Sequence, residues 1–248
     1  MTFLGKFFTS KNLSSPVDLS VLKCDMHSHF VPGIDDGAKS PENSIELIRF
    51  FYNQGYKKII TTPHIMGDFY RNTRETIFSG LEKVKHQLKS ENIPVELDAA
   101  AEYYVDYEFE KKIGKESLLT FGKNYILIEI SYVNQPDNLD RVLFELQTNG
   151  YQPILAHPER YPFWFDSIDK FEALANNGVL LQLNINSLTG YYSPQSRKMA
   201  EQLIDRQLVR FLGSDCHHTG HLEVIKQALY APYLKKLIDS GLLLNNTL

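Results

Sequence analysis

The chain has 248 residues, of which 43% are hydrophobic and 23% charged, and this composition is typical of a globular protein with a buried core. The formal net charge of −4 gives no overall basic surface, so nucleic acid is not an expected partner. The two cysteines, Cys24 and Cys216, are too few for a disulfide framework and favour a cytoplasmic location, and no apolar run is long enough to cross a membrane.

We expect an N-terminal arm over residues 1–20, followed by a single domain over residues 21–248. Residues 9–20 are rich in Ser, Asn and Lys and contain Pro16, which is typical of a linker. Residues 1–8 contain aromatic side chains but lack the basic start and the continuous apolar stretch of a signal peptide.

Within the domain, short apolar strands alternate with amphipathic helices. Strands are expected at residues 21–25, 57–62, 95–102, 125–130, 153–156, 179–184 and 209–213. Helices are expected from the N-cap Ser40 to Gly55 and at residues 74–90, 139–148, 167–176, 194–206 and 221–238, the last one broken by Pro232. Strands separated by helices predict a parallel sheet, either open and doubly wound or closed into a barrel.

Potential metal ligands stand at or just after the ends of these strands. The first strand runs into His27 and His29, whose side chains share one face of an extended segment. The other ligand-type residues are Asp36, His64, Glu102, Glu129, His157, Asp215 and His217. The carboxyl ends of barrel strands meet at one mouth, whereas the outer strands of an open sheet are too far apart to share a site. The distribution therefore favours a barrel with a metal site.

Seven sequence motifs, taken in order, resemble those of the polymerase and histidinol phosphatase (PHP) superfamily. They are His27-Ser-His29, the loop Pro32-Gly-Ile-Asp-Asp-Gly37, Thr61-Thr-Pro-His64, Ala101-Glu-Tyr-Tyr104, Ile128-Glu129, Ala156-His-Pro-Glu-Arg160 and Ser214-Asp-Cys-His217. Within the superfamily, residues 21–224 resemble the manganese-dependent protein-tyrosine phosphatases of bacterial capsule and exopolysaccharide systems. The resemblance implies a distorted TIM-like (β/α)7 barrel that holds three divalent transition metals, with Mn²⁺ as the first choice and Fe or Zn as alternatives.

The resemblance also divides the ligands among the three metals. One set is His27, His29, Glu102 and Asp215. A second metal shares Glu102 and is completed by Glu129 and His157, and the third is held by Asp36, His64 and His217. Catalytic roles are implied for Arg160, His217 and Asp36, with Arg160 as the cationic clamp on the phosphate. Neighbouring metals that bridge a water lower its pKa and supply a hydroxide nucleophile.

The implied function is hydrolysis of phosphotyrosine on a protein, namely the tail of a bacterial tyrosine kinase that controls capsule or exopolysaccharide synthesis. This partner predicts a cytoplasmic location near the inner membrane, and the oligomeric state stays open. Two alternatives remain: a small-molecule phosphatase of the histidinol-phosphate type, and a non-catalytic PHP-fold regulatory subunit. A metal-dependent amidohydrolase is less favoured, because no lysine lies among the ligands at the strand ends.

Three further features bear on the chemistry. A cysteine-based phosphatase needs an arginine six positions after the thiolate, and Phe30 and Leu222 stand there instead. The family's second arginine, expected shortly after His217, is missing, so His221 or Lys226 is expected to replace it. Aromatic residues follow the strand ends and could line a phosphotyrosine site: Tyr103, Tyr104, Tyr132, Tyr161, Phe163, Trp164, Tyr191 and Tyr192.

Overall fold

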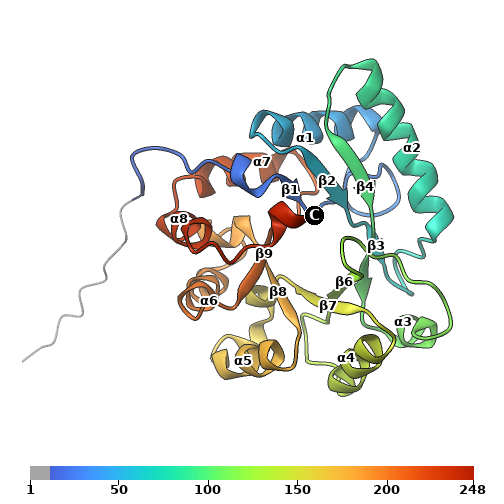
Figure 1. Cartoon of the computed structure of the whole chain (residues 1–248), viewed down its shortest axis with the longest axis vertical. Helices are drawn as coiled ribbons and strands as arrows, with labels where there is room; N and C mark the ends of the chain where they lie inside the picture. The colour runs from blue at the N-terminus through green and yellow to red at the C-terminus, as the bar shows by residue number, and fades with distance from the viewer. Residues whose placement is uncertain (1–11) are drawn as a thin grey trace, which may run out of the picture.

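In the computed structural model, which describes residues 12–248, parallel strands form a ring at the centre and helices surround it (Figure 1). Residues 1–11 of the predicted N-terminal arm lie outside the described residues. The strands are β1 (Cys24–Asp25), β2 (Lys58–Thr61), β3 (His64–Ile65), β4 (Glu96–Ala99), β5 (Glu102–Tyr104), β6 (Tyr125–Glu129), β7 (Gln152–Ala156), β8 (Leu180–Asn184) and β9 (Val209–Gly213).

The strands belong to two hydrogen-bonded sheets, with the orders β1-β2-β4 and β3-β5-β6-β7-β8-β9. The sheets are joined where β2 runs on into β3 and β4 into β5, because the Ala100 N–H donates to the Thr61 carbonyl at 2.9 Å. On the other side of the ring, Ser28 and Cys216 form an isolated parallel bridge between the extensions of β1 and β9. The described residues thus form a distorted (β/α)7 barrel, which confirms the predicted barrel over the open sheet.

Helices fill the connections between the strands, as the periodicity predicts. The α-helices are α1 (Pro41–Asn53), α2 (Arg74–Ser90), α3 (Tyr107–Lys112), α4 (Leu139–Thr148), α5 (Ile168–Asn176), α6 (Pro194–Asp205), α7 (Thr219–Ala228) and α8 (Pro232–Asp239). The predicted N-cap is confirmed, because the Ser40 hydroxyl accepts the Asn43 N–H at 3.3 Å. The break at Pro232 is also confirmed, while the short helix α3 was not predicted.

Two strand predictions were wrong in part. Residues 20–22 form a 3₁₀ helix, because the Asp18 carboxylate accepts the Ser20 N–H at 2.8 Å and closes a turn there. The single strand expected at residues 95–102 is divided into β4 and β5, since the chain passes from one sheet to the other at residues 100–101. The periodicity of the apolar residues predicted neither feature, because neither the turn nor the passage of the chain from one sheet to the other interrupts the apolar pattern.

The inside of the barrel is apolar at one end and polar at the other. Alternate strand residues share a face, so Tyr125 and Leu127 of β6 point into the barrel together with Glu129. An apolar cluster of buried side chains fills the amino-terminal end: Cys24, Met26, Ile60, Ala100, Phe121, Tyr125, Leu127, Ile154, Ala156 and Phe211. This cluster closes one end, so a site inside the barrel is reached from the carboxyl ends of the strands.

The described part of the predicted arm lies against the end of α7. The N–H groups of Leu13 and Val17 donate to the carbonyls of Tyr230 and Leu229, at 2.9 and 2.8 Å respectively. Among residues 12–248, none of the helices combines the length and hydropathy needed to cross a membrane.

Candidate metal centre

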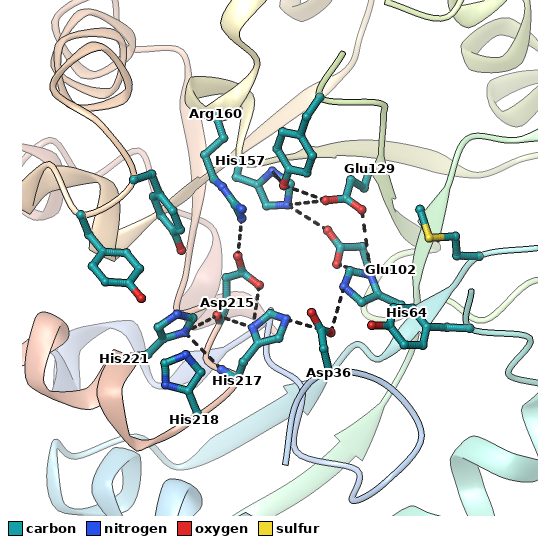
Figure 2. Close-up of a pocket in the computed structure, with 15 residues that line it drawn as sticks. Asp36, His64, Glu102, Glu129, His157, Arg160, Asp215, His217, His218 and His221 are labelled. Carbon is teal, nitrogen blue, oxygen red and sulfur yellow. Dashed lines mark hydrogen bonds and ion pairs between the residues drawn. The ribbon is translucent and has the colours of Figure 1, made fainter. Parts of the chain in front are cut away.

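The structure brings all nine predicted ligand residues together at the carboxyl ends of the strands, and Figure 2 shows those that line the cavity. Seven of them line a cavity of about 470 Å³, while His27 and His29 are fully buried beneath it. The seven are Asp36, His64, Glu102, Glu129, His157, Asp215 and His217. Residues that are up to 190 positions apart in the sequence therefore share one site, as the predicted barrel requires.

Their ligand atoms form four overlapping groups, and within each group the atoms lie within 4.8 Å of one another. The groups are His27, His29 and Asp215; His27, Glu102 and His157; His64, Glu102 and Glu129; and His29, Asp36, His64 and His217. Glu102 occurs in two groups and is central, since its carboxylate lies 3.3 Å from His27 Nε2 and 3.0 Å from His157 Nε2. The groups resemble the predicted division, and the assignment of ligands to three separate metals stays a prediction.

Two of these residues have left-handed backbone conformations. His157 has a φ of 33° and Asp215 a φ of 47°. Non-glycine residues rarely adopt this region, and they concentrate where the surrounding structure enforces a strained geometry at a functional site. Each of them follows directly or closely after a strand, β7 or β9, so the turn directs the side chain over the end of the barrel.

The two aspartates in the loop after β1 have different roles. Asp35 Oδ2 accepts the Nδ1–H of His29 at 2.8 Å and the backbone N–H of His64 at 3.1 Å. Asp36 Oδ1 lies 3.6 Å from His64 Nε2 and 3.4 Å from His217 Nε2. Asp36 therefore reaches the cluster as predicted, and Asp35 orients His29, a role that the sequence analysis missed.

Gly37 shapes the same loop. A Cβ atom at this position would lie 2.2 Å from the His29 carbonyl oxygen and 2.4 Å from His29 Cβ. Only glycine allows this close approach, so the loop can return over His29 and place Asp36 in the cavity.

The donor set fits divalent metals. Among the described residues, His64 Nδ1 and Glu102 Oε2 are buried without a hydrogen-bond partner, although they lie 3.1 Å apart. Two buried acceptors at this distance repel one another unless a proton or a metal cation lies between them. Imidazole and carboxylate ligands without thiolates suit manganese, iron or zinc. Cys24 and Cys216 are buried and stand outside the ligand groups.

Metal binding is expected to strengthen as pH rises, because a metal must displace protons from the metal-free cluster. Burial alone disfavours a charged His27, but Glu102 and Asp215 outweigh it and raise the pKa of His27 to about 9. Burial and the charge of Glu102 raise the pKa of Glu129 to about 7. Both groups are protonated below these values, so the affinity for Mn²⁺ should rise up to about pH 9, and more steeply below about pH 7.

Titrations of the metal-free protein with Mn²⁺ at several pH values, with proton release measured in weakly buffered solution, check this expectation. An affinity that stays constant between about pH 6 and pH 9 would contradict it.

Arg160 lies in the wall of the cavity beside the cluster (Figure 2). One guanidinium nitrogen donates to Asp215 Oδ2 at 2.8 Å, and the guanidinium lies 4.1 Å from the ring centre of Tyr192 and 5.0 Å from that of Tyr132. Burial disfavours its charge, yet the neighbouring tyrosines and Asp215 raise the pKa of Arg160. A permanent cation is therefore held at the site, paired with Asp215 rather than with the sequence neighbour Glu159 or with Asp166.

The two candidates to replace the missing second arginine lie in different places. Lys226 pairs with Glu223 at 2.6 Å on the exposed side of α7. His221 lines the cavity, and its Nδ1 lies 3.1 Å from the Asp215 carbonyl oxygen and 3.3 Å from the backbone nitrogen of His217. Burial lowers the pKa of His221 to about 4, so the ring is neutral at pH 7. Of the two, His221 is the one at the site, where it adds no positive charge at pH 7.

The predicted aromatic rim is present in part. Tyr132, Tyr191 and Tyr192 line the cavity, together with Tyr70 and Met66, which were not predicted. Other members of the predicted set are buried in the core instead, namely Tyr103, Tyr161 and Trp164. Sequence position near a strand end did not separate the two groups, because residues of both groups lie at or after the carboxyl ends of strands.

Comparison with known proteins agrees with this site. Residues 23–237 match the family described as "Capsular polysaccharide synthesis, CpsB/CapC". The chain is 31% identical over 195 residues to the tyrosine-protein phosphatase YwqE of Bacillus subtilis, which covers 78% of this chain and 77% of that protein. It is 27% identical over 218 residues to the tyrosine-protein phosphatase CpsB of Streptococcus pneumoniae, which covers 86% of this chain and 90% of that protein.

Solved structures give the same result. A structure from the work on "YwqE from Bacillus subtilis and CpsB from Streptococcus pneumoniae, unique metal-dependent tyrosine phosphatases" aligns with a TM-score of 0.77 at 28% identity, over 90% of this chain and 94% of that one. An amidohydrolase from Mycoplasma synoviae, at 15% identity and a TM-score of 0.52, shares the fold alone. The resemblance inferred from the motifs is thus confirmed, and the chain belongs to the CpsB/CapC family of capsular polysaccharide synthesis.

Proposed function

We propose that this protein is a metal-dependent protein-tyrosine phosphatase that acts in a capsule or exopolysaccharide pathway. The observation that carries the proposal is the cluster of nine imidazole and carboxylate ligands, which opens into a cavity beside the buried cation Arg160. The relatives named as tyrosine-protein phosphatases and as metal-dependent structures support it.

The metal ligands are proposed as His27, His29, Asp36, His64, Glu102, Glu129, His157, Asp215 and His217. Three divalent metals, with Mn²⁺ first and Fe or Zn as alternatives, agree with the four overlapping groups of ligand atoms. When bound, such metals lower the pKa of coordinated water and neutralise the charge of a phosphate ester. Burial and Arg160 lower the pKa of His157 to about 4, so this ring is neutral at pH 7 and free to act as a ligand.

The side chains around the cluster would bind and orient the ester. Arg160 is held by Asp215 and by two tyrosine rings, so its remaining N–H groups are available to the non-bridging phosphate oxygens. Asp36 and His217 stand together at the mouth of the cavity, 3.4 Å apart, where they would complete the site around the phosphate. Tyr132, Tyr191 and Tyr192 offer ring faces to the phenyl group of a phosphotyrosine.

The proposed substrate is a phosphotyrosyl protein, and the tail of a bacterial tyrosine kinase is our preferred candidate. A kinase at the inner membrane would place this protein in the cytoplasm near that membrane. The cavity is open and lined by polar and aromatic side chains, so a phosphorylated side chain that projects from a peptide can enter it.

A phosphatase assay with phosphotyrosyl peptide tests the proposal. We expect phosphate release that a chelator abolishes and added Mn²⁺ restores, with lower rates on phosphoseryl peptide and on histidinol phosphate. A metal content below about one transition metal per chain, together with no activity after Mn²⁺ is added, would refute the proposed enzymatic activity. The alternative of a non-catalytic regulatory subunit would then be favoured. Preference for histidinol phosphate would assign the protein to small-molecule hydrolysis instead.

A further inference from the structure

β8 contributes none of the nine ligand residues, yet it carries two fully buried amides at the end of the barrel that holds the cluster. Gln182 and Asn184 are two positions apart on this strand, so both side chains point into the barrel. Neither residue stood out in the sequence, because a glutamine and an asparagine are weak metal ligands and carry no charge.

Hydrogen bonds connect the two amides to ligand residues on either side. The Asn184 Nδ2–H donates to Asp215 Oδ2 at 2.7 Å, and the Gln182 Nε2–H donates to Asn184 Oδ1 at 2.8 Å. Gln182 Oε1 lies 2.8 Å from His27 Nδ1. Asp215, Asn184, Gln182 and His27 therefore form one continuous buried chain, which we call the amide relay.

The direction of every donor in the amide relay follows from its first member. The ionised Asp215 carboxylate can only accept, so Asn184 must present its NH₂ group to it and its carbonyl to Gln182. Gln182 must then donate to that carbonyl and present its own carbonyl to His27. The proton on His27 is thereby placed on Nδ1. The lone pair of Nε2 faces the cluster, where Glu102 Oε2 lies at 3.3 Å and Asp215 Oδ1 at 3.4 Å.

Gly213 on β9 makes room for the amide relay. A Cβ atom at this position would lie 2.7 Å from Gln182 Nε2 and 2.8 Å from His27 Cβ. The neighbouring strand thus lacks a side chain at the point where the amide of Gln182 passes between β9 and His27. The packing of three strands is adapted to this hydrogen-bond chain.

We infer that Gln182 and Asn184 are positioning residues, which hold His27 in its Nδ1–H tautomer and turn one oxygen of Asp215 toward the cluster. The inference rests on the proposed function only in taking the cluster as a metal centre. Hydrogen bonds to the far atom of a metal ligand fix its tautomer and orientation, and their loss typically lowers metal affinity about 10- to 100-fold.

The test uses the full chain with Gln182→Met, which keeps the side-chain volume but removes the hydrogen bonds to His27 and Asn184, and a third, longer one from the His157 N–H at 3.4 Å. Isotope-edited NMR of metal-free, histidine-labelled protein above about pH 9, where the ring of His27 is neutral, should show His27 protonated on Nδ1 in the wild type, with this signature lost or mixed in the variant. Titration with Mn²⁺ should show an affinity about 10- to 100-fold lower for Gln182→Met. Combining it with Asn184→Leu should add less than the two separate effects, because both substitutions interrupt one chain.

Asn245→Leu is the matched control. Asn245 is also fully buried and also bridges β1 and β9, since its amide donates to the carbonyls of Cys24 and Leu212, at 3.0 and 2.8 Å, but its side chain has no hydrogen bond to any of the nine ligand residues. This variant should be less stable and should bind Mn²⁺ as tightly as the wild type. An equal loss of affinity in both variants would indicate a merely structural role.

Two results would overturn the inference: wild-type affinity in Gln182→Met, or a neutral His27 ring in the wild type that carries its proton on Nε2. The tautomer measurement needs only the wild-type protein, so it decides the matter even if the variants fail to fold. If the wild type itself binds no Mn²⁺, the proposed function fails, while the NMR result still tests the direction of the amide relay.

Discussion

Replacing His157 by alanine is expected to lower kcat/KM for phosphotyrosyl peptide by at least about 100-fold. The loss of an outer hydrogen-bond partner of a ligand costs about 10- to 100-fold, and the loss of a ligand itself should cost more. His157 Nε2 lies 3.0 Å from Glu102 Oε1 and 3.5 Å from Glu129 Oε1, so its removal leaves two carboxylates together in a buried site. Steady-state kinetics and metal analysis of the purified variant measure both effects.

Cys216→Ser is the matched control for this prediction. Cys216 lies in the motif between Asp215 and His217, is fully buried, and stands outside the groups of ligand atoms. Burial and the nearby carboxylates raise the pKa of its thiol well above the usual value, so a thiolate nucleophile is not available. The variant should keep most of its turnover. Complete loss of activity with the metals still bound would contradict the metal-dependent mechanism.

Replacing Arg160 by methionine is expected to lower kcat about 100- to 1,000-fold, the usual cost of removing one preorganised donor to a developing negative charge. Its guanidinium is fixed by Asp215 and lies against the rings of Tyr132 and Tyr192, so little reorganisation is needed when a phosphate binds. The measurement is kcat and KM on phosphotyrosyl peptide, with metal content determined in parallel, since Asp215 also belongs to the ligand cluster.

Arg160→Lys provides the comparison. A lysine keeps the positive charge but lacks the planar fork that bonds Asp215 and stacks on the tyrosines. We expect the lysine variant to recover only a small part of the activity. Nearly full activity in Arg160→Lys would mean that charge alone suffices, and full activity in Arg160→Met would remove Arg160 from the proposed site.

Much of the fold could be predicted because its signals are local. α2 was predicted with its observed bounds, residues 74–90, because the helical spacing of its apolar residues lies within one short stretch of sequence. The division of residues 95–102 into β4 and β5 could not be predicted, because it depends on which neighbouring sheet each half joins. The same limit applies to Tyr161, which was expected at the rim and is instead buried, with its hydroxyl donating to the Ala156 carbonyl at 3.1 Å.

The candidate site, too, could be predicted from the sequence only in part. The sequence by itself determined which residues could bind metals, because imidazoles and carboxylates after strand ends meet at one mouth in any barrel. The motif resemblance named Asp36, but only the tertiary structure showed that the neighbouring Asp35 orients His29, since both occupy one short loop.

The tertiary structure also showed what the unremarkable strand β8 contributes. The bond between His27 and Gln182 joins residues 155 positions apart, and the bond between Asn184 and Asp215 spans 31 positions. Periodicity describes which face a side chain occupies, but a hydrogen-bond chain forms only when the barrel closes and brings β1, β8 and β9 side by side. The candidate metal ligands could therefore be identified from the sequence, and the groups that orient them could not.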